Sequence, residues 1–125
     1  MFLNSELVSD IKTDGVTFTI AKGTSDILDV YIYDEDGNVV TPGSNSSLKL
    51  SVKRNIEDLA PVINLSFVIL NDHFRTNINT SHTANLSPGR YFYDVMYKDA
   101  NAKFYQVIPT SYFYILPSCV DSSTM

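Results

Sequence analysis

Apolar and polar residues alternate with a period of two through much of the chain. Residues 16–20, 27–33 and 48–53 each place apolar side chains at every second position. Because successive side chains of a strand point to opposite faces of a sheet, this alternation predicts three half-buried strands. Asp29 sets the register of the second segment, since a slip of one residue would bury its carboxylate.

The second half of the chain contains further strand patterns. Residues 62–70 are the most apolar run, which predicts a fully buried strand or a pair of strands. Residues 90–98 are rich in β-favouring aromatic side chains. Residues 103–108 and 112–116 are two more apolar segments. Pro109 between them predicts a bulge or an edge position, because proline cannot donate to a ladder.

The remaining segments predict turns and less regular structure. Asp34 to Asn38 is typical of a hairpin turn that leads to a short strand at 39–40, and 99–102 predicts another turn. Residues 56–60 can form one helical turn before Pro61. Residues 73–85 are polar and predict an irregular segment, with a weak strand near Thr83–Leu86.

The two ends of the chain predict segments outside the main domain. Residues 1–15 predict an arm or irregular lead-in, which either folds back on the sheet or reaches a neighbouring protein. We expect its apolar residues Phe2, Leu3 and Leu7 to dock. Residues 117–125 are rich in serine and predict a flexible tail.

These patterns together predict seven or eight strands in one all-β domain at 16–116. No helical periodicity of useful length is present. The predicted fold is a single antiparallel β-sandwich with Ig-like, Greek-key topology. A jelly roll and a small closed barrel are the alternative folds.

A turn before residues 90–98 carries the clearest local signal in the chain. Leu86, Pro88, Gly89 and Tyr91 follow the spacing Leu-x-Pro-Gly-x-Tyr. This spacing is typical of the entry to a late strand of a Greek-key sandwich, where a tyrosine hydroxyl bonds back to the corner before it. We therefore expect these four residues to form a structural corner.

Length and charge limit the partners that the chain can have. A chain of 125 residues is the size of one domain. Its formal net charge of -5 argues against a nucleic-acid partner, because clustered lysine and arginine dominate affinity for phosphate backbones. No segment approaches the ~20 apolar residues of a membrane helix, so we expect no membrane partner. The N-terminal segment lacks a signal pattern and predicts synthesis in a cytoplasm.

From the residues that could carry chemistry, we expect no catalytic residues, no metal site and no cofactor. Asp34 to Asn38 resembles a calcium loop in its oxygen ligands, but strands flank it and Asp-Gly favours a plain hairpin turn. His73 and His82 lack the further ligands that a zinc site needs, so we expect solvated loop histidines. Cys119 is the single cysteine, without a nearby base to activate it.

Tyrosines on outward strand faces are the remaining functional signal. They are Tyr31, Tyr33, Tyr105 and either Tyr112 or Tyr114. Exposed tyrosines form protein interfaces or stack on sugars, and the alternative is that a neighbouring loop covers them.

Two blocks of sequence together carry a family resemblance. The first runs from Phe18 to Gly37, through Lys22-Gly23-Thr24 and the Asp36-Gly37 hairpin, and the second runs from Leu86 to Tyr97 and on to Phe104. They resemble small Ig-like β-sandwich domains of tailed-bacteriophage particles, such as the N-terminal domain of baseplate upper proteins. The turn at Asp99 and the proline at Pro109 depart from that family's pattern.

The resemblance implies a non-enzymatic structural protein of a virion. Such a protein decorates a capsid, or joins tail, baseplate or fibre parts through protein–protein contacts. The implied partners are other virion structural proteins, in a symmetric multimer. The implied location is the virion, assembled in the host cytoplasm. The alternative function is a carbohydrate-binding or host-adhesion module, which the outward tyrosines suggest.

Overall fold

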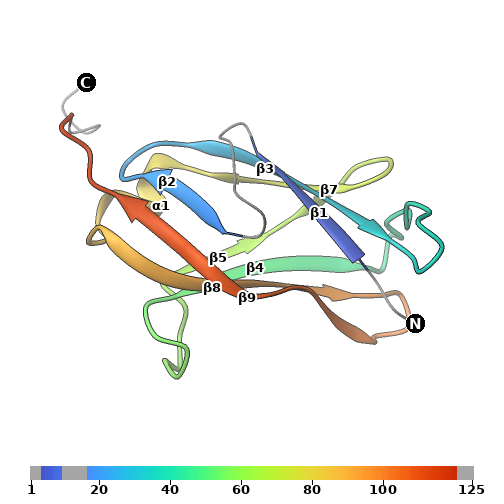
Figure 1. Cartoon of the computed structure of the whole chain (residues 1–125). Helices are drawn as coiled ribbons and strands as arrows, with labels where there is room; N and C mark the ends of the chain where they lie inside the picture. Colours follow the sequence, from blue (N-terminus) through green and yellow to red (C-terminus); the bar gives the residue numbers. More distant parts are fainter. Residues whose placement is uncertain (1–3, 10–16, 121–125) are drawn as a thin grey trace.

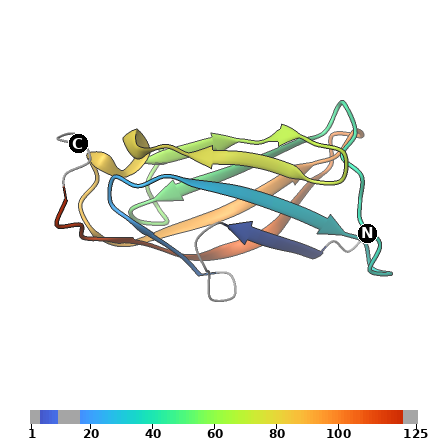
Figure 2. The ribbon, with the colours of Figure 1, turned by 90° about the horizontal axis from the view of Figure 1, so that it is seen from above.

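The chain forms a two-layer β-sandwich in a computed structural model that describes residues 4–9 and 17–120 (Figures 1 and 2). One layer is a four-stranded sheet with the order β1-β3-β7-β6, and the other is a five-stranded sheet with the order β2-β9-β8-β4-β5. The predicted all-β sandwich is therefore confirmed. The elements in chain order are β1 Asn4–Ser9, β2 Phe18–Ala21, β3 Asp26–Tyr33, β4 Ser47–Lys53, β5 Ile63–Ser66, β6 Val68–Ile69, β7 Phe74–Ile78, α1 Thr80–Ala84, β8 Gly89–Lys98 and β9 Phe104–Leu116.

The core lies between the two sheets and uses one phase of each alternating strand. Leu28 and Val30 of β3 and Leu50 and Val52 of β4 come from opposite sheets and belong to one core, and all four are at most 1% exposed. β8 buries its odd-numbered residues, from Tyr91 to Tyr97. The hydrophobic alternation in the sequence therefore decides which face of each sheet is covered.

One strand pair departs from the expected antiparallel arrangement. β2 runs parallel to the end of β9, with Phe18 opposite Phe113 and Ala21 opposite Leu116. The rings of Phe18 and Phe113 stack with centroids 5.0 Å apart, and both side chains are buried. The five-stranded sheet is therefore mixed, and burial of this aromatic pair stabilises the parallel contact.

The expected N-terminal arm folds back on the sandwich where the structure describes it. Residues 4–9 are the edge strand β1, antiparallel to β3 with Asn4 opposite Tyr33 and Ser9 opposite Leu28. An irregular lead-in is therefore wrong for these six residues, and the other expected course, a return to the sheet, is right. Phe2 and Leu3 lie outside the described residues, as do 10–16 and 121–125.

The apolar run 62–70 crosses from one sheet to the other. β5 pairs with β4 in the five-stranded sheet, whereas β6 pairs with β7 in the four-stranded sheet. Phe67 lies between the two strands and is buried, while Val68 is 61% exposed. The expected pair of strands is correct, but full burial is wrong for β6. It is an edge strand that pairs only with β7, and periodicity alone does not reveal an edge.

The polar segment 73–85 is more regular than its composition suggests. Phe74–Ile78 is strand β7, and Thr80–Ala84 is the short helix α1 in place of the weak strand expected near Thr83. Phe74, Thr76 and Ile78 are buried in alternation, so a period of two is present there. Thr83 is 0% exposed, and its hydroxyl accepts a hydrogen bond from the backbone N–H of Gly23 at 2.9 Å. This long-range bond attaches the helix to the turn before β3.

Residues 104–116 form one continuous strand with an irregular centre. The register of β8 and β9 shifts between Tyr93 and Val95, which pair with Ser111 and Ile108. Pro109 lies within this shift, beyond the four residues of β9 that β2 covers. The predicted bulge at Pro109 is therefore confirmed, and the two segments on either side of it belong to a single strand.

The turn before β8 has the hydrogen bond that its spacing predicts. The hydroxyl of Tyr91 donates to the carbonyl oxygen of Ser87 at 2.7 Å, and Tyr91 is 3% exposed. Leu86 packs against the core, and Gly89 has a φ of 148°. A Cβ atom at Gly89 would lie 2.9 Å from Nη1 of Arg54. The corner therefore needs glycine for its backbone conformation, and any other residue there would also displace the end of the Arg54 side chain.

Candidate functional site

The outer face of the five-stranded sheet carries a row of aromatic and cationic side chains. Cross-strand pairing of β8 and β9 places Arg90 opposite Tyr114 and Phe92 opposite Tyr112. The ring centroids of Phe92 and Tyr112 are 5.7 Å apart, and those of Tyr112 and Tyr114 are 6.0 Å apart. The inward phase of the same two strands builds the core. The outward-pointing side chains of β8 and β9 are therefore held in place by a well-packed sheet.

Two guanidinium groups are oriented by these and neighbouring rings. The guanidinium of Arg90 lies 4.9 Å from the ring centroid of Tyr112. Arg54 follows β4, and its guanidinium lies 4.7 Å from the ring centroid of Tyr91. Nη1 of Arg54 donates to the backbone carbonyl of Arg90 at 3.4 Å, which joins the two arginines. We refer to Arg54, Arg90, Phe92, Tyr112 and Tyr114 as the arginine–aromatic patch.

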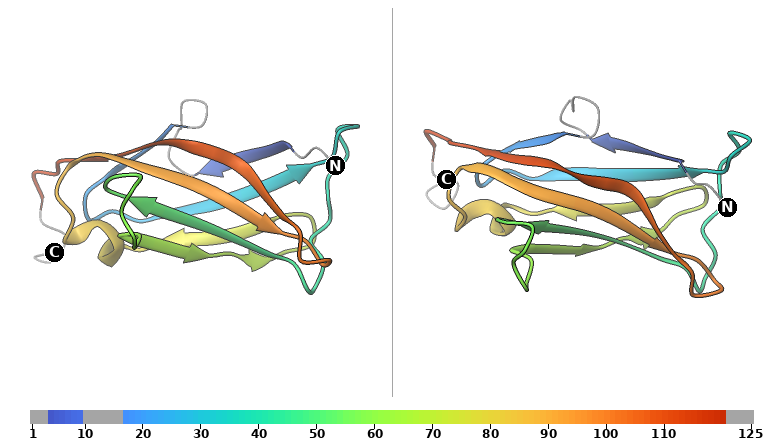
Figure 3. Two further views of the ribbon diagram at one scale, coloured as in Figure 1. Left: turned by 90° about the horizontal axis from the view of Figure 1, so that it is seen from below. Right: turned by 60° about the horizontal axis from the view of Figure 1, so that its bottom comes forward.

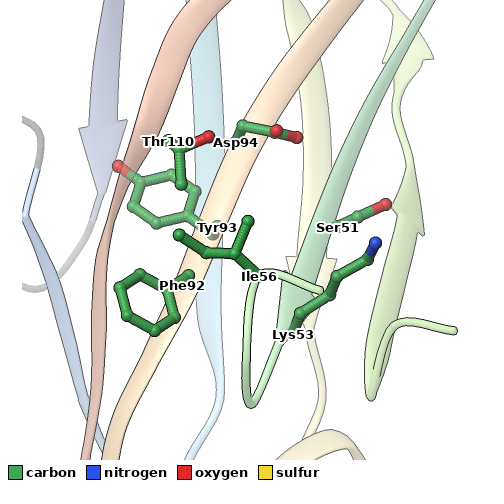
Figure 4. Close-up of a pocket in the computed structure, with 7 residues that line it drawn as sticks. All are labelled: Ser51, Lys53, Ile56, Phe92, Tyr93, Asp94 and Thr110. Atoms are coloured by element: carbon green, nitrogen blue, oxygen red, sulfur yellow. The ribbon is translucent and has the colours of Figure 1, made fainter. Parts of the chain in front are cut away.

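Two adjoining hollows lie on this patch and share Phe92. Arg54, Asn55, Arg90, Phe92 and Tyr114 line the first. The second has a volume of about 210 Å³, and its lining residues are drawn in Figure 4. It lies beside the loop between β4 and β5, whose course can be followed in Figure 3. Figure 4 shows Ile56 of this loop near Phe92. The other residues lining the second hollow are Ser51, Lys53, Tyr93, Asp94 and Thr110.

The chemistry of the patch suits binding. A guanidinium stacked on a ring keeps its N–H groups at the edge, where they can donate to a carboxylate or a phosphate. No carboxylate among residues 17–120 forms an ion pair with Arg54 or Arg90. Burial raises the pKa of Tyr93 to about 12, so this hydroxyl stays neutral at physiological pH. Tyrosine, phenylalanine and arginine are the residue types enriched in the cores of protein interfaces.

A second polar cluster covers the outer face of the four-stranded sheet. Arg75 of β7 donates two hydrogen bonds to Asp29 of β3, from Nε at 2.6 Å and from Nη2 at 3.0 Å. The ring of His73 stacks on Tyr31 with centroids 4.5 Å apart, and its Nδ1 lies 2.6 Å from Oδ1 of Asp72. The hydrogen bonds from Arg75 lower the pKa of Asp29, although burial acts in the opposite direction. The cluster thus joins β3 to β7 and to the turn before β7.

The histidine in this cluster is enclosed by its neighbours. Nε2 of His73 is buried, makes no hydrogen bond and lies 3.3 Å from Oδ1 of Asp29. Its Nδ1 is already paired with Asp72. Neither nitrogen is therefore available to a substrate in solution, and the cluster has a structural geometry. The prediction of a solvated loop histidine is wrong for His73, whose side chain is only 11% exposed.

The structure disperses the tyrosines that were expected to form an interface. Tyr31 and Tyr33 are half-buried in the outward phase of β3, where Tyr31 belongs to the His73 cluster. Tyr105 packs against the core and stacks on Tyr97 with centroids 6.2 Å apart. Leu7 lies on the edge strand β1. Tyr105 lies in the other sheet from Tyr31 and Tyr33, so these three tyrosines do not form one surface.

The sequence interpretation missed the two arginines and Phe92. It also offered Tyr112 and Tyr114 as alternatives, but both lie in the outward phase of β9, with Phe113 buried between them. The burial of Tyr91 and Tyr93 implies that Arg90 and Phe92 face outward, and this signal was available. Arg54 had no such signal, because it lies far along the chain from β8 and meets it only through the fold.

The acidic segment after β3 is a tight turn. The backbone N–H of Gly37 donates to the carbonyl of Asp34 at 3.0 Å, and Oδ1 of Asp34 accepts hydrogen bonds from the N–H groups of Asp36 and Asn38. The predicted hairpin turn is confirmed by these bonds. Within the described part of the chain, no group of three or more histidine, cysteine, aspartate or glutamate side chains is placed to hold a metal ion.

No protein-family model matches the chain, and a search of curated proteins gives no match. Among the residues that the structure describes, no helix is long and apolar enough to cross a membrane.

Proposed function

We propose that the chain is a non-enzymatic structural component of a bacteriophage virion that acts by protein–protein contacts through the arginine–aromatic patch. The observation that carries this proposal is the patch itself. It is a row of rings on a rigid sheet face, flanked by two arginines without carboxylate partners in the described residues. Such a surface gains stacking area and charge-assisted hydrogen bonds when a partner covers it.

The assignment to a virion is supported by the resemblance of residues 18–37 and 86–104 to Ig-like domains of phage particles. The turn before β8 supplies the corner expected of such a domain, with the bond from Tyr91 to Ser87. The proposed partners are other structural proteins of a capsid, tail, baseplate or fibre, and the proposed location is the assembled particle. A symmetric particle presents many copies, which multiplies a weak contact into firm attachment.

The experiment is mass spectrometry of purified particles of the phage that encodes the chain. We expect the wild-type chain in the particles. We expect a Phe92→Ala, Tyr112→Ala double variant to be depleted from them, while a Val68→Ala control on the opposite sheet is retained. Absence of the wild-type chain from particles would reject the virion assignment. Full retention of the double variant would reject the patch as the contact surface.

A carbohydrate-binding or host-adhesion module is the second candidate. The hollow beside Phe92 favours it, because Ser51, Lys53 and Asp94 line the same hollow as this aromatic ring and carry hydrogen-bonding groups. Sugars bind proteins through this combination of stacking and polar contacts. A glycan array probed with the wild-type chain and with Phe92→Ala distinguishes the two functions. Binding to a defined glycan that the variant loses would favour adhesion, and no binding by either protein would count against it.

A further inference from the structure

The geometry points to a second copy of this chain as the partner on the arginine–aromatic patch, with the acidic turn 34–38 of one copy received by Arg54 and Arg90 of the next. The inference rests on the proposed function, because it names the protein that the patch contacts. The copies would then associate head to tail.

The arginine–aromatic patch holds Arg54 and Arg90 in an arrangement that suits the binding of carboxylates. Arg54 and Arg90 line one hollow together with Phe92 and Tyr114. The stacking of Arg54 on Tyr91 and of Arg90 on Tyr112 fixes both guanidiniums before a partner arrives. Groups held in their bound orientation lose little conformational entropy on binding. The chain has fourteen carboxylate side chains, yet none of those among residues 17–120 forms an ion pair with either arginine.

The inserted side is a rigid and exposed acidic tip. Asp34 uses Oδ1 to bind the backbone N–H groups of Asp36 and Asn38, each at 2.9 Å. Gly37 has a φ of 83°, a left-handed conformation that glycine adopts without strain in a tight turn. Glu35 and Asp36 are exposed, and within the described residues their carboxylates make no hydrogen bond or ion pair. Two carboxylates without a cationic partner thus match two guanidiniums without a carboxylate partner among residues 17–120 in number and charge.

Apolar surface accompanies the charges on both sides. Val39 follows the acidic tip and is 42% exposed, while Tyr112 of the patch is 43% exposed and Leu116 nearby on β9 is 46% exposed. This matters because exposed ion pairs contribute about 1 kcal/mol or less each and cannot hold two proteins together alone. The apolar contacts supply affinity, and the charges orient copies whose net charge of -5 otherwise makes them repel each other.

The two surfaces lie at opposite ends of the sandwich. The turn after β3 is at the end where β3 finishes, whereas β4 finishes and β8 begins at the other end (Figure 1). A copy therefore cannot place its own turn on its own patch. A contact between unlike surfaces of identical chains is heterologous, and it closes into a ring or extends into a filament.

Sedimentation velocity of the purified full chain tests this inference with two charge-reversed variants. The first is Arg54→Glu with Arg90→Glu, and the second is Glu35→Lys with Asp36→Lys in the exposed turn. Lys49→Glu, on the outer face of β4 away from the patch, is the matched control. A thermal melt of each protein shows whether it is folded, and the turn variant keeps the test valid if the patch variant does not fold.

We expect wild type and the Lys49→Glu control to self-associate as concentration rises, and to do so less at high ionic strength. Each charge-reversed variant should remain monomeric, because its patch and turn then carry the same charge. A mixture of the two variants should associate again, since every patch then meets a turn of opposite charge. Monomeric wild type, or a mixture that stays monomeric, would overturn the inference.

The proposed function is tested separately by the content of particles. If the chain is present in particles but does not self-associate, the patch contacts another virion protein and only the identity of the partner is wrong. If it self-associates but is absent from particles, the head-to-tail contact remains and the virion assignment fails.

Discussion

Tyr91 shows how one side chain can have both a structural and a surface role. Its hydroxyl donates to the carbonyl of Ser87 and closes the corner, while its ring supports the guanidinium of Arg54. The Tyr91→Phe variant keeps the ring and removes the donor. We expect it to lower the free energy of unfolding by about 1 kcal/mol, because the Ser87 carbonyl loses its partner. Urea denaturation measures this, and Tyr112→Phe, whose ring is exposed, is the matched control. Equal stability of Tyr91→Phe and wild type would contradict the corner.

Gly89 is the other residue on which the corner depends. A residue with a side chain would be strained at its φ of 148°, and its Cβ atom would lie close to the guanidinium of Arg54. We expect Gly89→Ala to destabilise the fold by about 1 kcal/mol or more. In an Arg54→Ala background the steric part of this loss should disappear while the backbone part stays. Denaturation of the four proteins in a double-mutant cycle measures both parts. A loss equal in both backgrounds would show that Arg54 does not restrict this position.

At the scale of single residues, contacts between near neighbours in the chain could be predicted from their spacing, whereas contacts between distant residues could not. The bond from Tyr91 to Ser87 spans four residues, so the spacing from Leu86 to Tyr91 contained it. The contact of Arg54 with Arg90 spans 36 residues and depends on the pairing of β4 with β8. No pattern in a single sequence specifies which arginine will lie beside which ring.

The short helix α1 illustrates how elements depend on contacts far along the chain. Five residues are too few for a stable isolated helix, so tertiary contacts must hold α1 in place. Thr83 supplies one of them by accepting the N–H of Gly23. We expect Thr83→Val to lower the free energy of unfolding by about 1–3 kcal/mol, because the buried N–H loses its acceptor. Thr83→Ser retains the hydroxyl and should lose less. Urea denaturation compares them, and a larger loss in Thr83→Ser than in Thr83→Val would show that the methyl group rather than the bond matters.

The stabilisation that the Asp29–Arg75 pair gives to the contact between β3 and β7 depends on pH. Hydrogen bonds from Arg75 lower the pKa of Asp29 below its ordinary value of 3.8. The stabilisation is therefore complete above that value and is lost as the pH falls through the lowered pKa of the folded state. We expect the unfolding free energy of wild type to fall more steeply below about pH 4 than that of Asp29→Asn. Asp36→Asn, in the exposed turn, should follow wild type. Parallel pH profiles for wild type and Asp29→Asn would contradict this role.

Element type was easier to predict than the sheet to which an element belongs. The alternation in β3 and β4 was clear because each strand has one face on the core. The run 62–70 has no comparable signal at Phe67, where the chain crosses between sheets. β7 was missed because Arg75 and Asn77 give it a polar composition, although its buried positions alternate.

For the whole molecule, the candidate surface is a consequence of the same pleat that builds the core. Tyr91, Tyr93 and Phe113 face inward, and so Arg90, Phe92 and Tyr112 face outward in one row. The sandwich fold and its corner could be predicted from the sequence. The complete patch could not, because it joins strands β8 and β9 to the loop after β4, and these segments meet only in the folded chain.

Hydroxyl-radical footprinting in assembled particles tests the central claim most directly. Oxidation of Phe92 and Tyr112 is compared between the free chain and purified particles, with Val68 and Ile69 on the opposite sheet as internal references. The account predicts that the two patch residues are strongly protected in the particle while the references are modified to the same extent in both samples. Equal oxidation of Phe92 and Tyr112 in free and assembled chains would contradict the role of the patch.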